Sequence, residues 1–337
     1  MNKAFKLLGL LFVGHISFAQ LDLSTVLEGG VDDAQVFLEN YIEPATAGFG
    51  YGLNGGWYNT AKTHKRFGVD ISVISNASLI PTNKEFFTFN NADYTNIKLT
   101  DNSVSSASIP TLLGPFGGAG AENNRPLLNF TFNEGNDDIS ISAPPGLGLK
   151  EDIGYNIIPT ATIQAGIGLF KHTDVKFRYI PKISAQDAEL STFGIGLMHD
   201  IKHWLPFINK LPIDMSALIA WTNVNSKVSL NPTDEPTQAV EFDTNSLTFQ
   251  LVASKKLSIL TIYGGIGTSS FNSEVSLLGN YKTESKTYTD PINVNFKGQS
   301  LRSNVGVRLK LLIFTFSADY AFQEYNTFTA GFGFSIR

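Results

Sequence analysis

The last eleven residues of the chain alternate without exception between apolar and small or polar side chains. Phe328, Ala330, Phe332, Phe334 and Ile336 occupy one phase, and Thr, Gly and Ser side chains occupy most of the other. Because successive side chains of a strand point to opposite faces, this segment predicts a strand with one apolar face. An apolar outer face and a small inner face are typical of a transmembrane β-barrel, so we expect its closing strand here.

The same two-residue period recurs throughout the chain. It predicts further strands at 49–57, 67–73, 161–169, 175–179, 192–197, 213–221, 247–253, 260–266, 305–311 and 314–322. A less regular strand at 84–99 gives twelve, and Leu127 to Phe132 with Ile139 to Ser142 would give fourteen. The predicted fold class is all-β: a transmembrane antiparallel β-barrel of about 12–14 strands, with a short N-terminal helix and one long inserted loop.

Two pieces fall outside the predicted wall. Residues 24 to 43 have helical periodicity and a capping-box pattern, and Pro44 is expected to end the helix. We assign 20–45 to an N-terminal helical or plug segment that lies on the membrane, caps the barrel mouth or enters the lumen. The second piece, 100–156, is a long loop or lumen insert. Its centre is rich in Gly, Pro and Asn, and its apolar residues suggest that it folds inward.

The N-terminus predicts export. A basic start, an apolar core and the small residues Ser17 and Ala19 form a secretory signal peptide over 1–19, which leaves 46–337 for the barrel. No run of about 18 apolar residues follows, so a transmembrane helix is not expected. We therefore expect the outer membrane as the location.

Loop lengths predict the orientation of the barrel. Short connections at 170–174, 203–211, 254–258 and 311–313 would lie with the chain end on the periplasmic side. The opposite side would receive long loops at 101–154, 225–239 and 268–290.

Composition agrees with such a barrel. Charged residues are 16% of the chain, against about 25% in average soluble proteins, and mean hydropathy is 0.00. Alternating apolar and polar positions produce this pairing of few charges with no net hydrophobicity. Without Lys3 and Lys6 of the signal peptide, 23 basic side chains stand against 30 acidic ones, so nucleic acid is not an expected partner.

The chain resembles a known family. A helical segment before the first strand, the Gly-rich stretch Gly50 to Gly56 and about fourteen strands are similar to the FadL-like outer-membrane β-barrel family, whose members carry hydrophobic compounds. The block Gly196 to Pro206 and the following Leu211 to Asp214 most resemble an uncharacterised FadL-related family from Bacteroidota. The resemblance implies an outer-membrane barrel.

Candidate chemistry is sparse, and we expect no enzyme, no cofactor and no metal. His199 and His203, beside Asp200, could bind a metal on a helix, but a periplasmic turn anchored by Trp204 explains them better. The acidic run 133–138 could hold Ca²⁺, yet a polar hairpin turn is simpler. No Gly-x-Ser-x-Gly motif occurs, and the five His residues leave little for a catalytic triad.

Charged residues at strand positions predicted to face the lumen are the remaining functional candidates. Most would solvate or cross-link the barrel interior, but opposed charges can also position a ligand or hold a plug. Arg is the residue that a carboxylate-bearing ligand would seek, so we select Arg178, Arg302 and Arg308 as candidate ligand contacts. The other lumen-phase charges are Asp70, Lys176, Asp214, Lys310 and Asp319.

Two functions remain open. The first is a passive channel or transporter for small hydrophobic or amphiphilic compounds, gated by the N-terminal segment and the long loop. The second is a non-transporting barrel that acts as a scaffold or accessory subunit of an outer-membrane secretion or assembly complex. The expected partners are accordingly the lipid bilayer of the outer membrane, a hydrophobic small molecule and outer-membrane proteins. A continuous apolar pocket with a lateral or axial path would favour transport, and a blocked lumen with an apolar patch on the loops would favour the scaffold.

Overall fold

The computed structural model describes residues 27, 29–116, 125, 127–130, 139–185, 187–204, 211–231, 235–283 and 286–336. The signal peptide predicted at 1–19, the turn predicted at 133–138 and the terminal Arg337 lie outside these residues.

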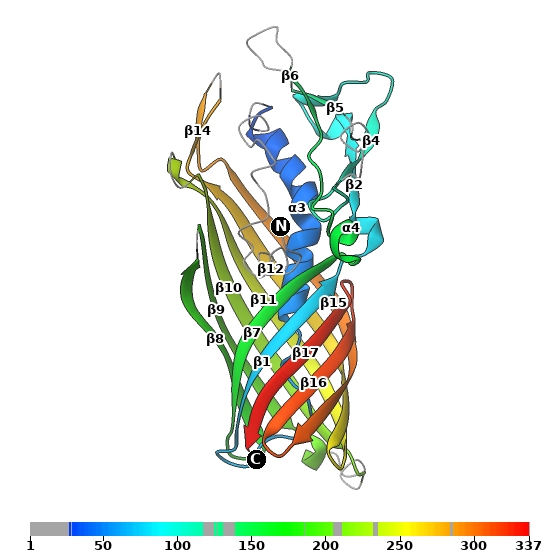
Figure 1. Cartoon of the computed structure of the whole chain (residues 1–337), viewed down its shortest axis with the longest axis vertical. Helices are drawn as coiled ribbons and strands as arrows, with labels where there is room; N and C mark the ends of the chain where they lie inside the picture. The colour runs from blue at the N-terminus through cyan, green and yellow to red at the C-terminus, as the bar shows by residue number, and fades with distance from the viewer. Residues whose placement is uncertain are drawn as a thin grey trace.

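Ten antiparallel strands close into a ring in the order β1-β17-β16-β15-β12-β11-β10-β9-β8-β7 (Figure 1). The predicted fold class, an all-β transmembrane barrel, is confirmed. The first and last strands of the wall pair with each other along their whole length, so the ring leaves no free edge at this join. The strands are β1 (Val69–Leu79), β7 (Ile157–Gly168), β8 (Thr173–Ala185), β9 (Ala188–Asp200), β10 (Asp214–Asn231), β11 (Glu235–Leu257), β12 (Leu260–Leu278), β15 (Ile292–Leu311), β16 (Phe314–Phe322) and β17 (Thr327–Ile336).

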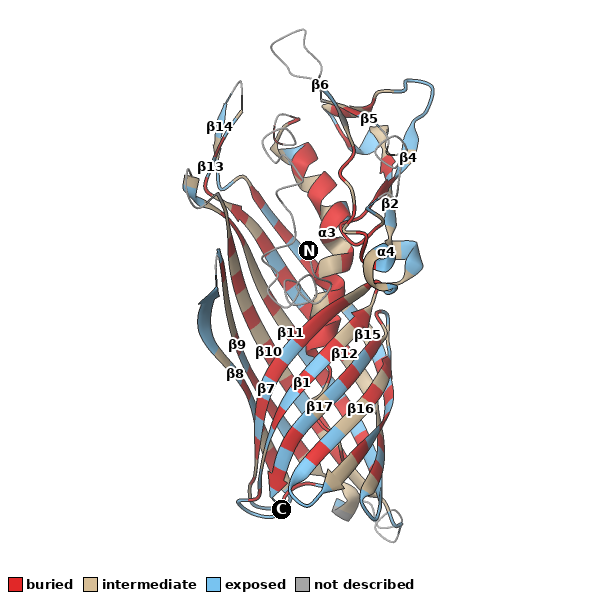
Figure 2. Ribbon diagram, viewed as in Figure 1, coloured by how far each residue is buried: buried red, intermediate tan, exposed pale blue. Residues whose placement is uncertain are grey.

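The closing strand β17 has the two faces that its sequence predicts. Phe328 and Phe332 lie on the outside of the ring and are 48% and 42% exposed, whereas Thr327 and Thr329 are buried in the lumen. The other strands repeat this alternation, which Figure 2 shows as bands of buried and exposed residues. The outer face is therefore an apolar belt suited to lipid.

The ring has fewer strands than the predicted 12–14, because four predicted strands lie elsewhere. Residues 49–53 belong to a helix, and 84–99 contributes β2 (Phe86–Asn90) and β3 (Ile97–Leu99) to sheets outside the ring. The two optional strands form β5 (Leu127–Phe130), which pairs with β3, and β6 (Ile139–Ser142), which pairs with β5. Short alternation alone does not distinguish a wall strand from a strand of a small sheet.

The helix α3 (Val31–Leu53) is longer than predicted and contains Pro44, which was expected to end it. Proline has no backbone N–H, so the helix lacks the hydrogen bond that residue 44 would otherwise donate. The carbonyl of Tyr41 accepts the backbone N–H of Leu112 at 2.8 Å, and the hydroxyl of Thr46 donates to the carbonyl of Glu43 at 2.9 Å. One hydrogen bond from the insert and one within the helix thus flank the proline.

The chain between β1 and β7 forms an insert above the ring, on the side away from the C-terminus (Figure 1). The sheets β2-β4 and β3-β5-β6 make up most of it. Its apolar side chains pack on α3 and share one cluster with it. The remaining elements of the insert are η3 (Thr82–Lys84), η4 (Asn91–Asp93), β4 (Ser106–Pro110) and α4 (Leu149–Ile153).

The insert is fastened to α3 by polar contacts. The carboxylate of Asp33, 4% exposed, accepts the backbone N–H groups of Thr95 (2.8 Å), Asn96 (2.6 Å) and Ile97 (2.9 Å). The hydroxyl of Tyr41 donates to the carbonyl of Pro145 at 2.7 Å. The upper helix and the insert therefore share one core.

The loops predicted at 225–239 and 268–290 are largely strand, which corrects that prediction. β10, β11, β12 and β15 continue above the belt, and the hairpin β13 (Asn280–Lys282) and β14 (Thr287–Thr289) follows β12. Above the belt, the inner faces of these wall strands are apolar: Val275 and Phe296 are buried against the core that α3 and the insert form. This tall wall exists because it covers α3, which the local sequence does not reveal.

No helix among the described residues combines the length and apolar character that a membrane span requires. The 3-10 turn η6 (Lys202–Trp204) follows β9 at the base of the ring.

Candidate functional site: the plugged lumen

The lumen is occupied by the end of α3 and the segment 54–68 that leads from it to β1. We call 48–68 the plug. Glycines let the helical part approach the wall: a Cβ added to Gly50 would lie 2.4 Å from the Phe271 ring, and one added to Gly52 would lie 2.8 Å from Oγ of Ser78. The Gly-rich alternation that predicted a strand at 49–57 is thus a packing requirement of a helix.

Arg178 of β8 fastens the top of the plug. Its Nη1 donates to the carbonyl of Leu53 at 2.7 Å, and its Nη2 donates to the carbonyl of Gly55 at 2.6 Å. The guanidinium also lies 3.8 Å from the ring centroid of Trp57 and donates from Nε to Gln164 at 3.1 Å. A fully buried Arg thus binds the last carbonyl of α3 and that of Gly55 beyond it, and stacks on Trp57.

The middle of the plug is held through Tyr58. Its hydroxyl lies 2.5 Å from Oε1 of Gln250 and 2.6 Å from Oδ1 of Asn304. Asn304 in turn donates to Asp319 at 3.3 Å, and the hydroxyl of Tyr263 donates to the same carboxylate at 2.9 Å. This network joins the plug to four strands of the wall, β11, β12, β15 and β16.

The base of the plug is held by His64. Its Nδ1 lies 2.8 Å from the carboxylate of Asp174, which also accepts the His64 backbone N–H at 2.9 Å. Its Nε2 faces Asp70 at 3.4 Å. On the other side, the backbone N–H of Ala61 donates to Ser254 at 2.9 Å. The plug is therefore tied to the wall at three heights.

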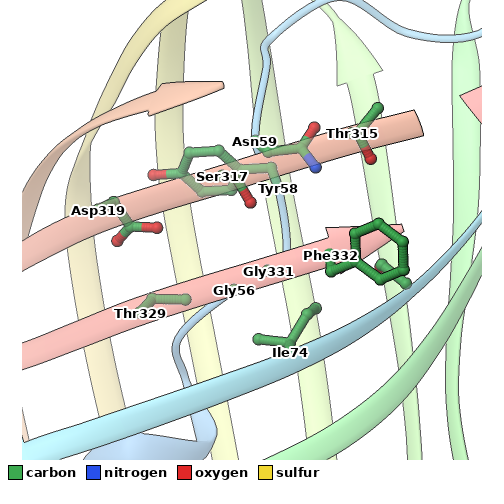
Figure 3. A pocket seen from close by; sticks show the side chains of 11 residues that line it. Gly56, Tyr58, Asn59, Ile74, Thr315, Ser317, Asp319, Thr329, Gly331 and Phe332 are labelled. Carbon is green, nitrogen blue, oxygen red and sulfur yellow. The ribbon is translucent and has the colours of Figure 1, made fainter. Parts of the chain in front are cut away.

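Two small cavities lie beside the plug, each of about 10 Å³. The upper one lies between Tyr58 and Asn59 of the plug and Ser317, Asp319 and Gly331 of the wall (Figure 3). A cavity of this size holds about one water molecule. These cavities are too small for a hydrophobic cargo.

The lower cavity is lined by charged groups. His64, Asp70, Asp174, Lys176 and Arg308 all border it. Cationic and anionic groups are mixed there, so the arrangement suits water and charge pairing more than an apolar ligand.

The three Arg residues predicted as ligand contacts all face the lumen and are buried. Arg178 holds the plug, Arg302 donates from Nη1 to Gln323 at 2.9 Å, and Arg308 borders the lower cavity. Arg178 and Arg302 border neither of the two cavities. The structure thus places the three at different points of the lumen, and their role as ligand contacts stays a prediction.

Sequence reasoning did not identify Trp57, Tyr58 or His64 as lumen residues. Trp57 and Tyr58 follow a stretch that resembles a strand, and His64 lies in a segment without periodicity. The cluster of glycines from Gly48 to Gly56 was the available signal, because a helix or strand that needs so many glycines is pressed against other backbone.

The wall contains a seam between β7 and β8. The two strands pair only up to Gln164 and Arg178. Above this point β7 stays paired with β1 as far as Ile157, and β8 stays paired with β9 as far as Ala185, while the two strands diverge (Figure 1). In the described part of the chain, no strand pairs with β7 over 157–163 or with β8 over 179–185 on the sides where these two strands face each other. We call these two unpaired segments the seam.

The β8 side of the seam has features that protect an open edge. Pro181 lacks a backbone N–H, Lys182 carries a charge, and the register with β9 shifts between Ile180 and Ile183. Natural sheets use proline, lysine and irregular register to prevent an edge strand from pairing with another chain. The sequence of β8 is therefore compatible with a seam that stays open.

His199, weighed above as a metal ligand and assigned to an anchored turn instead, contacts other side chains. Nδ1 of His199 lies 2.8 Å from Oγ1 of Thr173, and its ring centroid lies 4.9 Å from that of Trp204. The side chain of His203 lies outside the described residues. No group of three His, Cys, Asp or Glu side chains in the described part of the chain is arranged to hold a metal ion. These contacts agree with a turn anchored by Trp204.

Comparison with solved structures finds other barrels at low identity. Ail, the attachment invasion locus protein of Yersinia pestis, is 8% identical over 81% of this chain and 100% of that chain, with a TM-score of 0.27. The translocator domain of the autotransporter NalP from Neisseria meningitidis is 10% identical over 81% of this chain and 90% of that chain, with a TM-score of 0.26. The toluene transporter TodX of Pseudomonas putida is 8% identical over 88% of this chain and 93% of that chain, with a TM-score of 0.23.

No curated protein matches the sequence. A family model does match, over residues 1–336, and its description is a family of unknown function. The chain therefore belongs to the DUF6588 family.

Proposed function

We propose that the protein is an outer-membrane transporter that moves a small hydrophobic or amphiphilic molecule by a lateral route through the seam. The seam is the observation that carries this proposal, because the axial route is filled by the plug. The resemblance to FadL-like transporters supports the same class of cargo.

The seam places the plug helix next to the apolar belt. The two strand edges that border the seam, which we call its lips, carry Ile163 on β7 and Tyr179 on β8. These side chains are 50% and 62% exposed on the outer face. Behind it lies α3, where a Cβ on Gly48 would be 3.3 Å from Ile158 of β7. A hydrophobic molecule dissolved in the membrane would meet apolar lips here, and the unpaired strands are the part of the wall that opens with the fewest lost hydrogen bonds.

A disulfide-free chain allows a direct test, because the sequence contains no cysteine. Ile163→Cys with Tyr179→Cys places one thiol on each lip, at the first position beyond the last pair. A reducible bifunctional thiol reagent would then bridge the seam. The matched control, Val73→Cys with Ile163→Cys, bridges β1 and β7, which are already paired at these positions.

The readout is uptake of a hydrophobic fluorescent probe by cells that carry the protein in the outer membrane. We expect the bridged seam to slow uptake several-fold, a reducing agent to restore it, and the control bridge to leave it unchanged. Equal uptake with and without the protein, or unchanged uptake with the seam bridged, would contradict the proposal.

We further propose that Arg178, Arg302 and Arg308 meet the polar head of an amphiphilic cargo once the plug moves. Arg178 can do so only if it releases the carbonyls of Leu53 and Gly55. Arg178→Met should therefore loosen the plug and raise ion conductance in planar bilayers above that of the parent protein. The control is Lys150→Met, because Lys150 pairs with Glu85 in the insert, outside the plug. Unchanged conductance in Arg178→Met would show that this residue does not hold the plug closed.

A scaffold is the second candidate function, and the insert favours it. Apolar side chains of the insert are 43–67% exposed at five positions: Phe86, Val104, Phe116, Leu127 and Tyr155. Exposed apolar groups are often sites of protein contact. Purification in mild detergent followed by mass spectrometry separates the two functions, because a stoichiometric protein partner without bound lipid would support the scaffold and contradict transport.

A further inference from the structure

The outer face of the tall wall changes character just above the apolar belt. On β10, Trp221 is the last large apolar side chain of the outward phase, and it lies beside Leu247 of β11 in the strand register. Its ring also meets that of Phe193 at 6.1 Å. Tryptophan is enriched where a barrel wall passes from acyl chains to headgroups, so this row marks the upper border of the belt.

The next two outward rows consist of carboxamides and carboxylates. The register aligns each row across three neighbouring strands, and all six residues are partly or fully exposed. We call these residues the polar panel: Asn223, Asn245 and Asn272 in the lower row, and Asn225, Asp243 and Glu274 in the upper row.

Hydrogen bonds between neighbours hold three of the six panel residues in one arrangement. Nδ2 of Asn223 donates to Oδ1 of Asp243 at 3.0 Å and to Oδ1 of Asn245 at 3.2 Å. Nδ2 of Asn245 donates to the same oxygen of Asp243 at 2.8 Å. Side chains that are already ordered lose less conformational entropy when they bind a ligand.

The height of the panel identifies the kind of molecule beside it. Asn223 follows Trp221 by two residues, which is about 7 Å along a strand. This distance places the lower row at the level of lipid headgroups when Trp221 lies at the interface. The panel is thus continuous with the lipid-facing belt and faces the headgroups of the same leaflet.

The chemistry of the panel selects among headgroups. Carboxamides present a donor and an acceptor side by side, and carboxylates add acceptors, which matches the paired hydroxyls of a sugar. The six panel residues include no Arg or Lys, and a single cation, Lys297 of β15, borders the lower row beside Asn272. Carboxamides and carboxylates therefore dominate the surface that a headgroup meets. We propose that the polar panel binds the carbohydrate headgroup of a glycolipid in the outer leaflet, whose acyl chains lie on the apolar belt below.

The test compares two lipids with the same anchor. Purified full-length protein in mild detergent is titrated with lipooligosaccharide, which carries core sugars, and with lipid A, which lacks them, and binding is measured by native mass spectrometry. The parent protein should bind lipooligosaccharide about tenfold more tightly, which corresponds to one or two net hydrogen bonds.

Asn245→Thr with Asn272→Thr removes two carboxamides and keeps residues that favour strands. We expect this variant to bind both lipids equally and to keep the thermal unfolding midpoint of the parent. The control is Asn280→Thr in β13, an exposed Asn outside the panel, which should keep the preference for lipooligosaccharide. Equal binding of the two lipids by the parent protein, or an unchanged preference in the double variant, would overturn the proposal.

Discussion

The lower and upper parts of β15 have opposite polarity although they belong to one strand. In the lower part Val305 faces outward and Asn304 faces the lumen. In the upper part Val294 is buried on the inner face and Asn295 is exposed on the outer face. The two-residue period continues along the whole strand. What changes is that the apolar side chains face outward in the lower part and inward in the upper part.

The exchange shows that the surroundings decide which face is apolar. Beside the lower part lies lipid on the outside and a polar plug on the inside. Around the upper part the outer residues are polar, and α3 with the insert forms an apolar core inside. Each variant below changes one of these four environments, and the expected effects decrease from the first to the last.

The largest effect is expected on the inner face of the upper part. Val294→Asp would bury a carboxylate in an apolar core, because Val294 is 1% exposed. We expect the free energy of unfolding to fall by about 4 kcal/mol or more. Reversible urea unfolding in detergent micelles measures this change. A loss below about 1 kcal/mol would mean that the upper part is not a packed core.

A smaller loss is expected on the outer face of the lower part. Val305→Lys places a charge midway between Leu301 and Leu309 on the outward phase of β15. A lysine at the bilayer midplane of a barrel costs about 2–4 kcal/mol. Folding into lipid vesicles rather than micelles is the appropriate measurement. If Val305→Lys is neutral in vesicles, this face does not lie on the acyl chains.

Removal of the contact between α3 and the insert should have a local effect. Asp33→Ala leaves three backbone N–H groups, at Thr95, Asn96 and Ile97, without their acceptor, and we expect a loss of about 2 kcal/mol. Hydrogen exchange at these amides should accelerate while exchange in the ring stays unchanged. Asp32→Ala is the matched control, since Asp32 is exposed. Acceleration in the ring as well would show that the insert and the ring unfold together.

The smallest effect is expected on the outer face of the upper part. Asn295→Val gives this exposed position the residue type that Val305 provides in the lower part. The free energy of unfolding should change by less than about 0.5 kcal/mol, because no core contact is altered. Urea unfolding checks this as well, and a stabilisation above about 1 kcal/mol would indicate that lipid or protein covers the position.

The wall was the part of the fold that sequence reasoning predicted best. All ten ring strands begin or pass through segments selected by alternation, from 67–73 to the chain end, because the barrel leaves each strand with two different faces over its whole length. Alternation failed at 49–57, where the small residues serve contact between helix and wall. It also failed at Asn225 to Ala239 and Thr268 to Asp290, where polar outward residues were interpreted as loops.

The candidate site was predicted less well. Alternation placed Arg178, Arg302 and Arg308 in the lumen, since that requires only the phase of each strand. It could not predict that Arg178 would bind the carbonyls of Leu53 and Gly55, more than 120 residues away in sequence. Contacts of this range depend on where the plug enters the ring.

The sequence by itself determined that the chain forms an amphipathic antiparallel wall, because a two-residue period is a local property of each strand. Only the tertiary structure decided the number of strands in the ring, the course of α3 past Pro44, the position of the plug and the seam between β7 and β8. These features depend on contacts between segments far apart in the chain. The tertiary structure also decided which face of the upper wall is apolar, because that depends on whether lipid, water or the α3 core lies against the face.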